Sequence, residues 1–226
     1  MNSTPSLFRV ARRSVLSVAV MAAVLVGLAT TTSVQAQASK KGEKAAASLK
    51  ALAKEVEAGD KQIGVVTAAL NQLVNKPNED LKKPYKQFEK GVKKLESITA
   101  SARKRQVGLK QEKDAYLQAW DQEIAKISNE DIKSRSAERK QKVTDELAKL
   151  SDLSSKLSES YKAFEQNLID IRSALSADLT PGGVQAVAPV ANKARENAVS
   201  VRDNLKSLSA ELETLGFAMS SKAQKP

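Results

Sequence analysis

Residues 143–175 place apolar side chains at a spacing that suits one long helix. Ten positions in this segment follow alternating steps of four and three residues, and only Ser154 among them is polar. The ten positions are Val143, Leu147, Leu150, Ser154, Leu157, Tyr161, Phe164, Leu168, Ile171 and Leu175. An average step of 3.5 residues sets one stripe along one side of an α-helix and is typical of a coiled coil. The segment therefore predicts an all-α fold, with long helices packed side by side at shallow crossing angles.

The same spacing recurs in three further segments, at residues 49–73, 81–120 and 187–215. Polar turn signals separate these segments, and Asn129 is suited to cap the helix that follows it. The segment Thr180–Gly183 is predicted to be a loop, and Pro189 is predicted to mark a kink or the start of the last helix. The predicted helices cover residues 44–75, 79–128, 131–177 and 185–215.

The two middle helices are expected to be longer than the outer two. At 1.5 Å per residue they would each be about 70 Å long, against about 45–50 Å for the first and last helices. Both outer helices join the same end of the middle pair, so they can cover only its near part. We predict a base of three or four antiparallel helices, from which a two-helix coiled-coil hairpin projects over roughly residues 110–148.

Four apolar residues make this hairpin a candidate surface for contact with a partner. They are Tyr116, Trp120, Ile124 and Ile127. The facing segment, residues 133–142, is mostly polar, and a turn near residue 129 would place Trp120 opposite about Glu138. An apolar stripe without an apolar counterpart predicts partner contact or dimerisation at the tip. The alternative is a loosely packed tip in which Trp120 is half covered.

The N-terminus has the pattern of a secretory signal peptide. Three arginines, at positions 9, 12 and 13, precede an apolar run from Val15 to Ala29, and the small-residue site Val34-Gln35-Ala36 follows. We expect cleavage after Ala36, or alternatively after Ala38, and a periplasmic location. An uncleaved membrane anchor is the alternative, but the run is shorter than the roughly 20 residues that a spanning helix needs.

The predicted domains follow from these segments. Residues 1–36 form the signal peptide, 37–43 a flexible tail, 44–215 the helical domain, and 216–226 a flexible C-terminal tail. The chain contains no cysteine, which excludes disulfides and the lipid anchor of a bacterial lipoprotein. The helical domain is therefore expected to depend on packing alone for its stability.

The residue types needed for most catalytic chemistry are missing. The chain has no histidine, so histidine-based acid–base catalysis and catalytic triads are excluded. Without histidine and cysteine, zinc and haem sites are effectively excluded as well. The acidic residues alternate with lysines on outer helix positions, as in a solvated face. We therefore predict that the protein is not an enzyme and has no cofactor and no metal site.

The excess of basic over acidic residues is not strongly segregated, but most of it lies in residues 40–102. The whole chain has 37 basic and 26 acidic residues, and loss of residues 1–36 would remove three arginines and leave a net charge of +8. One cluster stands out, and it consists of Lys82, Lys83, Lys86, Lys90, Lys93 and Lys94. The cluster lies off the heptad positions, so it is either a solvated face or a contact for an anionic surface. In an exported protein that surface would be lipid, glycan or an envelope protein, and not nucleic acid.

Two segments resemble an uncharacterised bacterial family of exported helical coiled-coil proteins, a domain of unknown function. The first is Trp120-Asp121-Gln122-Glu123-Ile124, followed by Ile127-Ser128-Asn129 and Arg135-Ser136, and the second is the helix with Tyr161, Phe164, Leu168 and Asp170. The likeness covers roughly residues 85–215. Within this range the chain departs from the family pattern directly after Asp170, where residues 171–175 replace the Lys-His-Asn-Leu-Asn run associated with the family. The resemblance implies a helical fold and export, and it implies no activity.

These features predict a non-enzymatic periplasmic coiled-coil protein that scaffolds or binds a partner in the cell envelope. The expected partner is an envelope protein or an anionic envelope surface, and self-association into a homo-oligomer is a further alternative. Two other functions fit a basic helical hairpin: a periplasmic holdase chaperone for unfolded envelope proteins, and a peripheral binder of anionic membrane surface.

Overall fold

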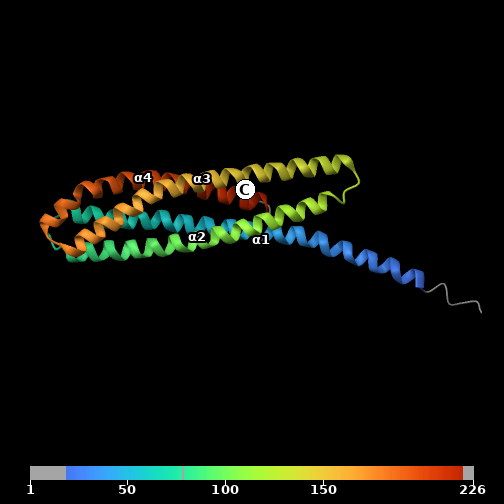
Figure 1. Cartoon of the computed structure of the whole chain (residues 1–226), viewed down its shortest axis with the longest axis horizontal. Coiled ribbons are helices and arrows are strands. Elements are labelled where there is room, and N and C mark those ends of the chain that lie inside the picture. The colour runs from blue at the N-terminus through green and yellow to red at the C-terminus, as the bar shows by residue number, and fades with distance from the viewer. Residues whose placement is uncertain (1–18, 78, 221–226) are drawn as a thin grey trace, which may run out of the picture.

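The computed structural model describes residues 19–77 and 79–220, with side chains from residue 38 onward. It consists of four helices, α1 (Ala19–Asn75), α2 (Lys82–Ile124), α3 (Glu130–Ala177) and α4 (Pro181–Ala218), joined by short connections (Figure 1). No strand occurs in this part of the chain. The prediction of an all-α fold is therefore confirmed. The predicted start of the signal peptide and the last six residues lie outside the described residues.

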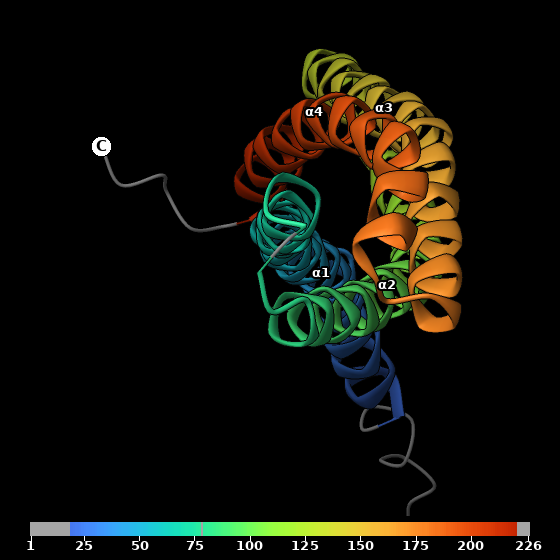
Figure 2. The same ribbon diagram turned by 90° about the vertical axis from the view of Figure 1, so that its left-hand side faces the viewer.

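The four helices run up and down in chain order around a ring, as the view along the long axis shows (Figure 2). The interfaces between neighbouring helices are here called seams. Three of the four seams are closely packed, because α1 contacts both α2 and α4, and α3 contacts α4. The fourth seam, between α2 and α3, holds far fewer contacts. The bundle is therefore closed on three sides and loosely joined on the fourth.

The core lies inside this ring and draws apolar side chains from all four helices. Phe88 of α2 and Phe164 of α3 are completely buried, as are Leu49, Ile63 and Leu70 of α1. α4 contributes a long buried stripe, whose core positions are Val184, Val187, Ala191, Ala194, Ala198, Val201, Leu205, Leu208, Leu212 and Leu215. Each large apolar side chain stabilises the fold by about 1.5–3 kcal/mol when it is fully buried.

The ends of the helices agree with the sequence at some positions and differ at others. Asn129 caps α3 as predicted, because its side chain accepts a hydrogen bond of 3.0 Å from the backbone N–H of Ile132. The prediction of a loop at 180–183 is wrong. Thr180 caps α4 by accepting a bond from the N–H of Gly183, and Pro181 takes the first helical position, which its fixed φ suits. Pro189 lies inside α4, which continues through it.

Glycine at position 183 is required by the tightness of the turn between α3 and α4. A Cβ atom there would lie 2.1 Å from the carbonyl oxygen of Asp178. The Pro-Gly-Gly run therefore begins α4 directly after a short, tight connection and is not a flexible loop.

The outer helices extend further along α2 and α3 than the sequence pattern indicated. Residues 38–43, assigned to a flexible tail, continue α1, and Gly42 lies against the ring of Tyr116. Toward the C-terminus of the chain, α4 continues to Ala218. The carbonyl of Ala218 accepts a hydrogen bond of 2.8 Å from Arg139. Each added segment contains a glycine, Gly42 or Gly216, and both glycines are buried within the continuing helices.

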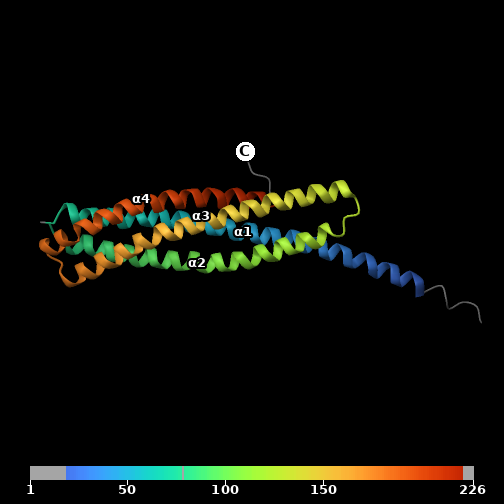
Figure 3. The ribbon, with the colours of Figure 1, turned by 45° about the horizontal axis from the view of Figure 1, so that its top comes forward.

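The predicted limits of the projecting hairpin, 110–148, are consequently too wide. Val143 is completely buried and Ala119 is 4% exposed, so the base reaches both residues. The α2–α3 connection extends past the end of α4 in Figures 1 and 3. The part of this pair that α4 does not accompany begins near Arg139, where the last contact with Ala218 occurs.

The heptad stripe of α3 is buried at its ends and half-exposed in its middle. α3 is one continuous helix through 143–175, and Val143, Leu150, Phe164, Leu168, Ile171 and Leu175 are buried. The positions between them, Leu147, Ser154, Leu157 and Tyr161, are only half-buried. The middle of the stripe thus lacks a tight partner across the α2 seam, and the supercoiling of a coiled coil stays a prediction.

An ion pair links α1 to α4 near the middle of the bundle. Asp60 accepts bonds of 2.6 Å and 3.2 Å from Nε and Nη2 of Arg202, and its side chain is 21% exposed. These bonds hold the pKa of the Asp60 carboxyl below its ordinary value of 3.8, against the opposing effect of burial. Because the pKa is lowered on folding, the pair stabilises the fold above pH 3.8 and the contribution is lost as the pH falls below that value.

We expect Asp60→Asn to lower the free energy of unfolding at pH 7 by about 0.5–1 kcal/mol, the range for a partly exposed ion pair. The difference from the wild type should shrink as the pH falls from 4 to 2, as the wild-type carboxyl becomes protonated. Urea unfolding at several pH values measures both effects. Asp152→Asn is the matched control, because Asp152 is exposed and has no ion pair in the described structure. A difference that persists unchanged at pH 2 would contradict this assignment.

Candidate functional site

The six predicted lysines of α2 lie on one outward face of the helix. Lys82, Lys83, Lys86, Lys90, Lys93 and Lys94 are all exposed. With 3.6 residues per turn they fall within an arc of about 120° and along about 18 Å of helix. The buried residues Phe88, Val92 and Leu95 occupy the opposite side of α2. We call these six lysines the lysine face.

The lysine face has little compensating negative charge. Only Lys93 is paired, to Glu89 at 2.9 Å, and no other member lies within 4.0 Å of a carboxylate in the described chain. By contrast, eight lysines elsewhere in the described residues do pair with an acidic side chain. The face therefore presents five unneutralised ammonium groups to the solvent in one direction.

Two of these lysines lie at the N-terminus of α2, where a helix favours negatively charged side chains. Lys82 and Lys83 occupy the first turn of α2, which contains no acidic residue. The backbone N–H groups at a helix N-terminus carry a partial positive charge, so cations there are unfavourable. A local arrangement that lowers stability without an evident structural gain is typical of functional positions.

We expect the double substitution Lys82→Glu/Lys83→Glu to raise the free energy of unfolding by about 0.5–1.5 kcal/mol at low salt. The reason is that a negative side chain interacts favourably with the partial positive charge at the helix N-terminus. The measurement is urea unfolding at low and high ionic strength. Lys104→Glu/Lys110→Glu in the interior of α2 makes the same change in net charge away from the helix end, and it should stabilise less. Equal effects for the two variants would show that the helix terminus is not the cause.

The four tip residues are all half-buried, and the structure brings two of them together. The rings of Tyr116 and Trp120 lie 5.4 Å apart between centroids, and burial raises the pKa of the Tyr116 phenol. The indole N–H of Trp120 donates a bond of 3.1 Å to Oγ of Ser136, so Trp120 faces Ser136 and not Glu138 as predicted. Residues of the 38–43 segment of α1 and Met219, just after α4, line the same surface hollow as these rings. Partner contact at the tip therefore stays a prediction.

A cavity that the sequence pattern did not reveal opens between α2 and α3. Its volume is about 140 Å³, and all four helices contribute to its wall. The apolar part of the wall consists of Leu52, Val56, Gly59, Ile63, Leu95, Ile98, Ala102, Leu157, Leu205 and Leu208. The cavity occupies the loosely joined seam, at the level where the α3 stripe is only half-buried.

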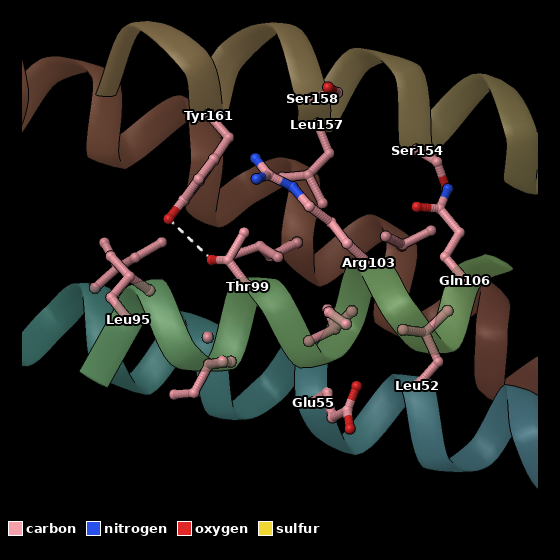
Figure 4. Close-up of a pocket in the computed structure, with 17 residues that line it drawn as sticks. Leu52, Glu55, Leu95, Thr99, Arg103, Gln106, Ser154, Leu157, Ser158 and Tyr161 are labelled. Atoms are coloured by element: carbon pink, nitrogen blue, oxygen red, sulfur yellow. Dashed lines mark hydrogen bonds between the residues drawn. The ribbon is translucent and has the colours of Figure 1, made fainter. Parts of the chain in front are cut away.

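Polar side chains border the opening of this cavity. Oγ1 of Thr99 donates a bond of 2.9 Å to the Tyr161 hydroxyl, which joins α2 to α3 across the seam (Figure 4). Further along, Gln106 extends from α2 toward Ser154 of α3 in the same view. The guanidinium of Arg103 lies above the opening, with Glu165 at 3.7 Å as its acidic neighbour. Burial raises the pKa of Tyr161, so its hydroxyl remains neutral well beyond physiological pH.

The α1 wall of the cavity contains one carboxylate. Oε1 of Glu55 accepts bonds from Arg105 at 3.0 Å and Ser101 at 2.9 Å. The other oxygen, Oε2, is buried and has no hydrogen-bond partner. An unpaired buried acceptor is unfavourable, and it would disfavour a second negative charge nearby.

A signal for this cavity was present in the sequence. Thr99, Gln106 and Ser154 are polar members of otherwise apolar heptad stripes. A hairpin that turns near residue 129 places Gln106 at the level of Ser154 and Thr99 at the level of Tyr161. The polar positions therefore coincide across the seam, which a comparison of the two stripes in antiparallel register could have shown.

The chain matches no family model, no curated protein and no solved structure. The family resemblance of residues 85–215 therefore stays a prediction. None of the described helices has an apolar stretch long enough to cross a membrane.

Proposed function

We propose that the chain is a non-enzymatic protein, exported to the bacterial periplasm, that binds the anionic lipid surface of the cell envelope through the lysine face. The observation that supports binding is the set of five exposed lysines without a carboxylate partner on one side of α2. The proposal of export rests on the N-terminal pattern of arginines, an apolar run and small residues.

The charge arrangement suits a flat surface better than a small ligand. The six lysines are spread over about 18 Å of a straight helix and point into one half-space. Each lysine near an anionic bilayer contributes about 1 kcal/mol to the free energy of binding. This contribution decreases with distance from the bilayer and is largely screened beyond one Debye length. Binding is therefore expected to weaken steeply as salt increases.

In the proposed architecture, lipid binding by the lysine face would let the protein act as a scaffold. The lysine face lies at the end of the molecule that holds the α1–α2 and α3–α4 connections, and the α2–α3 connection lies at the far end (Figure 1). A protein held by the lysine face would keep that far end, with the proposed two-helix coiled-coil hairpin, away from the lipid contact. An envelope protein could then bind there.

We expect the purified mature protein to sediment with vesicles that contain phosphatidylglycerol and to remain in solution with pure phosphatidylcholine vesicles. Lys86→Gln/Lys90→Gln/Lys94→Gln should weaken binding by about a hundredfold, since three lysines contribute about 3 kcal/mol. Lys142→Gln/Lys156→Gln/Lys162→Gln removes the same charge from exposed positions of α3 and should change binding much less. Equal losses in both variants, or no sedimentation with anionic vesicles, would contradict the proposal.

The proposal of export has its own test. We expect the protein recovered from a bacterial periplasmic extract to begin at Gln37 or Ser39, as measured by the intact mass and the N-terminal peptide. A chain that keeps residues 1–36, or that stays in the cytoplasmic fraction, would contradict export. Neither result bears on lipid binding by the purified helical domain.

A further inference from the structure

We propose that the cavity between α2 and α3 is a binding site for a small neutral aromatic molecule that carries one hydroxyl group, of the size of phenol. The site is separate from the lysine face. Its wall comes from all four helices, whereas the lysine face belongs to the outer side of α2. The inference does not depend on the proposed lipid binding.

The size and lining of the cavity set the class of ligand. A volume of about 140 Å³ is close to that of an apolar protein cavity of about 150 Å³ that binds benzene. The inner wall is formed by leucine, isoleucine, valine and alanine side chains, among them Leu95, Leu205 and Leu208. One aromatic ring would replace the dispersion contacts that these side chains lack at present.

The polar groups at the opening favour a neutral hydroxyl over a charged group. Thr99, Tyr161, Gln106 and Ser154 provide uncharged donors and acceptors there. Arg103 carries the one positive charge on the wall, and Glu165 lies 3.7 Å from it. Glu55, whose Oε1 is paired with Arg105 at 3.0 Å, adds a buried oxygen, Oε2, without a hydrogen-bond partner. A ligand hydroxyl could donate a bond to this oxygen, whereas a ligand carboxylate has no proton to donate.

The site is reachable from the solvent. Arg103, Gln106 and Ser158 border the opening and are exposed. Because α2 and α3 contact each other much less than the other neighbouring helices do, a ligand can enter here without separating a packed seam.

The test uses one glycine inside the cavity and one outside it. Gly59 lies on the cavity wall, and an added Cβ would be 4.0 Å from the nearest atom, Cγ2 of Ile98, so leucine has room there. Gly64, in the same helix, has no atom within 4 Å of an added Cβ. Gly59→Leu fills the cavity and Gly64→Leu does not, and both replace a helix-interior glycine with a better helix former.

We expect phenol to bind the full helical protein at one saturable site with a Kd on the order of 1 mM, as measured by NMR titration of leucine and valine methyl groups. Gly59→Leu should weaken binding at least tenfold, and Gly64→Leu should leave it unchanged. Benzoate, which has the same ring and a negative charge, should bind at least tenfold more weakly than phenol. Tyr161→Phe should weaken phenol binding and leave benzene binding unchanged.

Three results would overturn the inference. They are the absence of saturable shifts at 20 mM phenol, equal binding by the wild type and Gly59→Leu, and benzoate binding as tight as phenol binding. A circular-dichroism melt of each variant shows whether it is folded before the titration. Because both glycine variants are expected to be at least as stable as the wild type, loss of binding in Gly59→Leu alone reports on the cavity.

Discussion

The burial of the apolar stripes of α1 and α4 is the interaction on which the rest of the fold depends. α1 packs against α2 on one side and against α4 on the other, and α4 in turn holds α3. The four helices thus form a connected series, α2–α1–α4–α3, in which every close seam includes α1 or α4. The chain has no cysteine, so no disulfide assists this packing. The ends of the series, α2 and α3, pack against each other much less closely, and polar bonds such as Thr99–Tyr161 and Arg172–Glu96 join them.

The loosely packed α2–α3 seam and the lysine face both follow from the side chains that α2 carries on its different sides. One side of α2 turns Phe88, Val92 and Leu95 into the core, and its outer side carries the lysines. The side toward α3 has to serve the fourth seam, but there its heptad positions are polar at Thr99 and Gln106. Polar side chains cannot replace apolar packing without a cost, so the seam stays loose and a cavity remains.

Much of the fold could be predicted from the sequence, because apolar periodicity and caps are local signals. The end of α1 at Asn75, the end of α3 at Ala177 and the cap at Asn129 agree with the structure. The start of α4 was placed too late, since Pro and Gly near Thr180 signal a loop as readily as a helix start. The length of α1 before residue 44 was missed because a tail and a helix of the same polar, Ala-rich composition look alike in sequence.

The candidate sites also differ in how far the sequence could predict them. The lysine face could be predicted because exposure follows from periodicity within one helix. The partner of Trp120 was misplaced by two residues, because the exact register of a hairpin depends on a turn whose geometry the sequence does not specify. The cavity depends on four helices at once, and its wall residues Leu52, Leu95 and Leu205 are ordinary stripe residues when each helix is considered alone.

The bundle is closed along three seams and loosely joined at the fourth. Native-state hydrogen exchange measures this directly, because amides in weakly packed helix segments open at lower free energy. We expect amides of residues 97–107 in α2 and 147–161 in α3 to exchange faster than those of residues 164–175 and of the core positions of α1 and α4. Uniform protection along all four helices, or slower exchange in the middle of α3 than at residues 164–175, would contradict it.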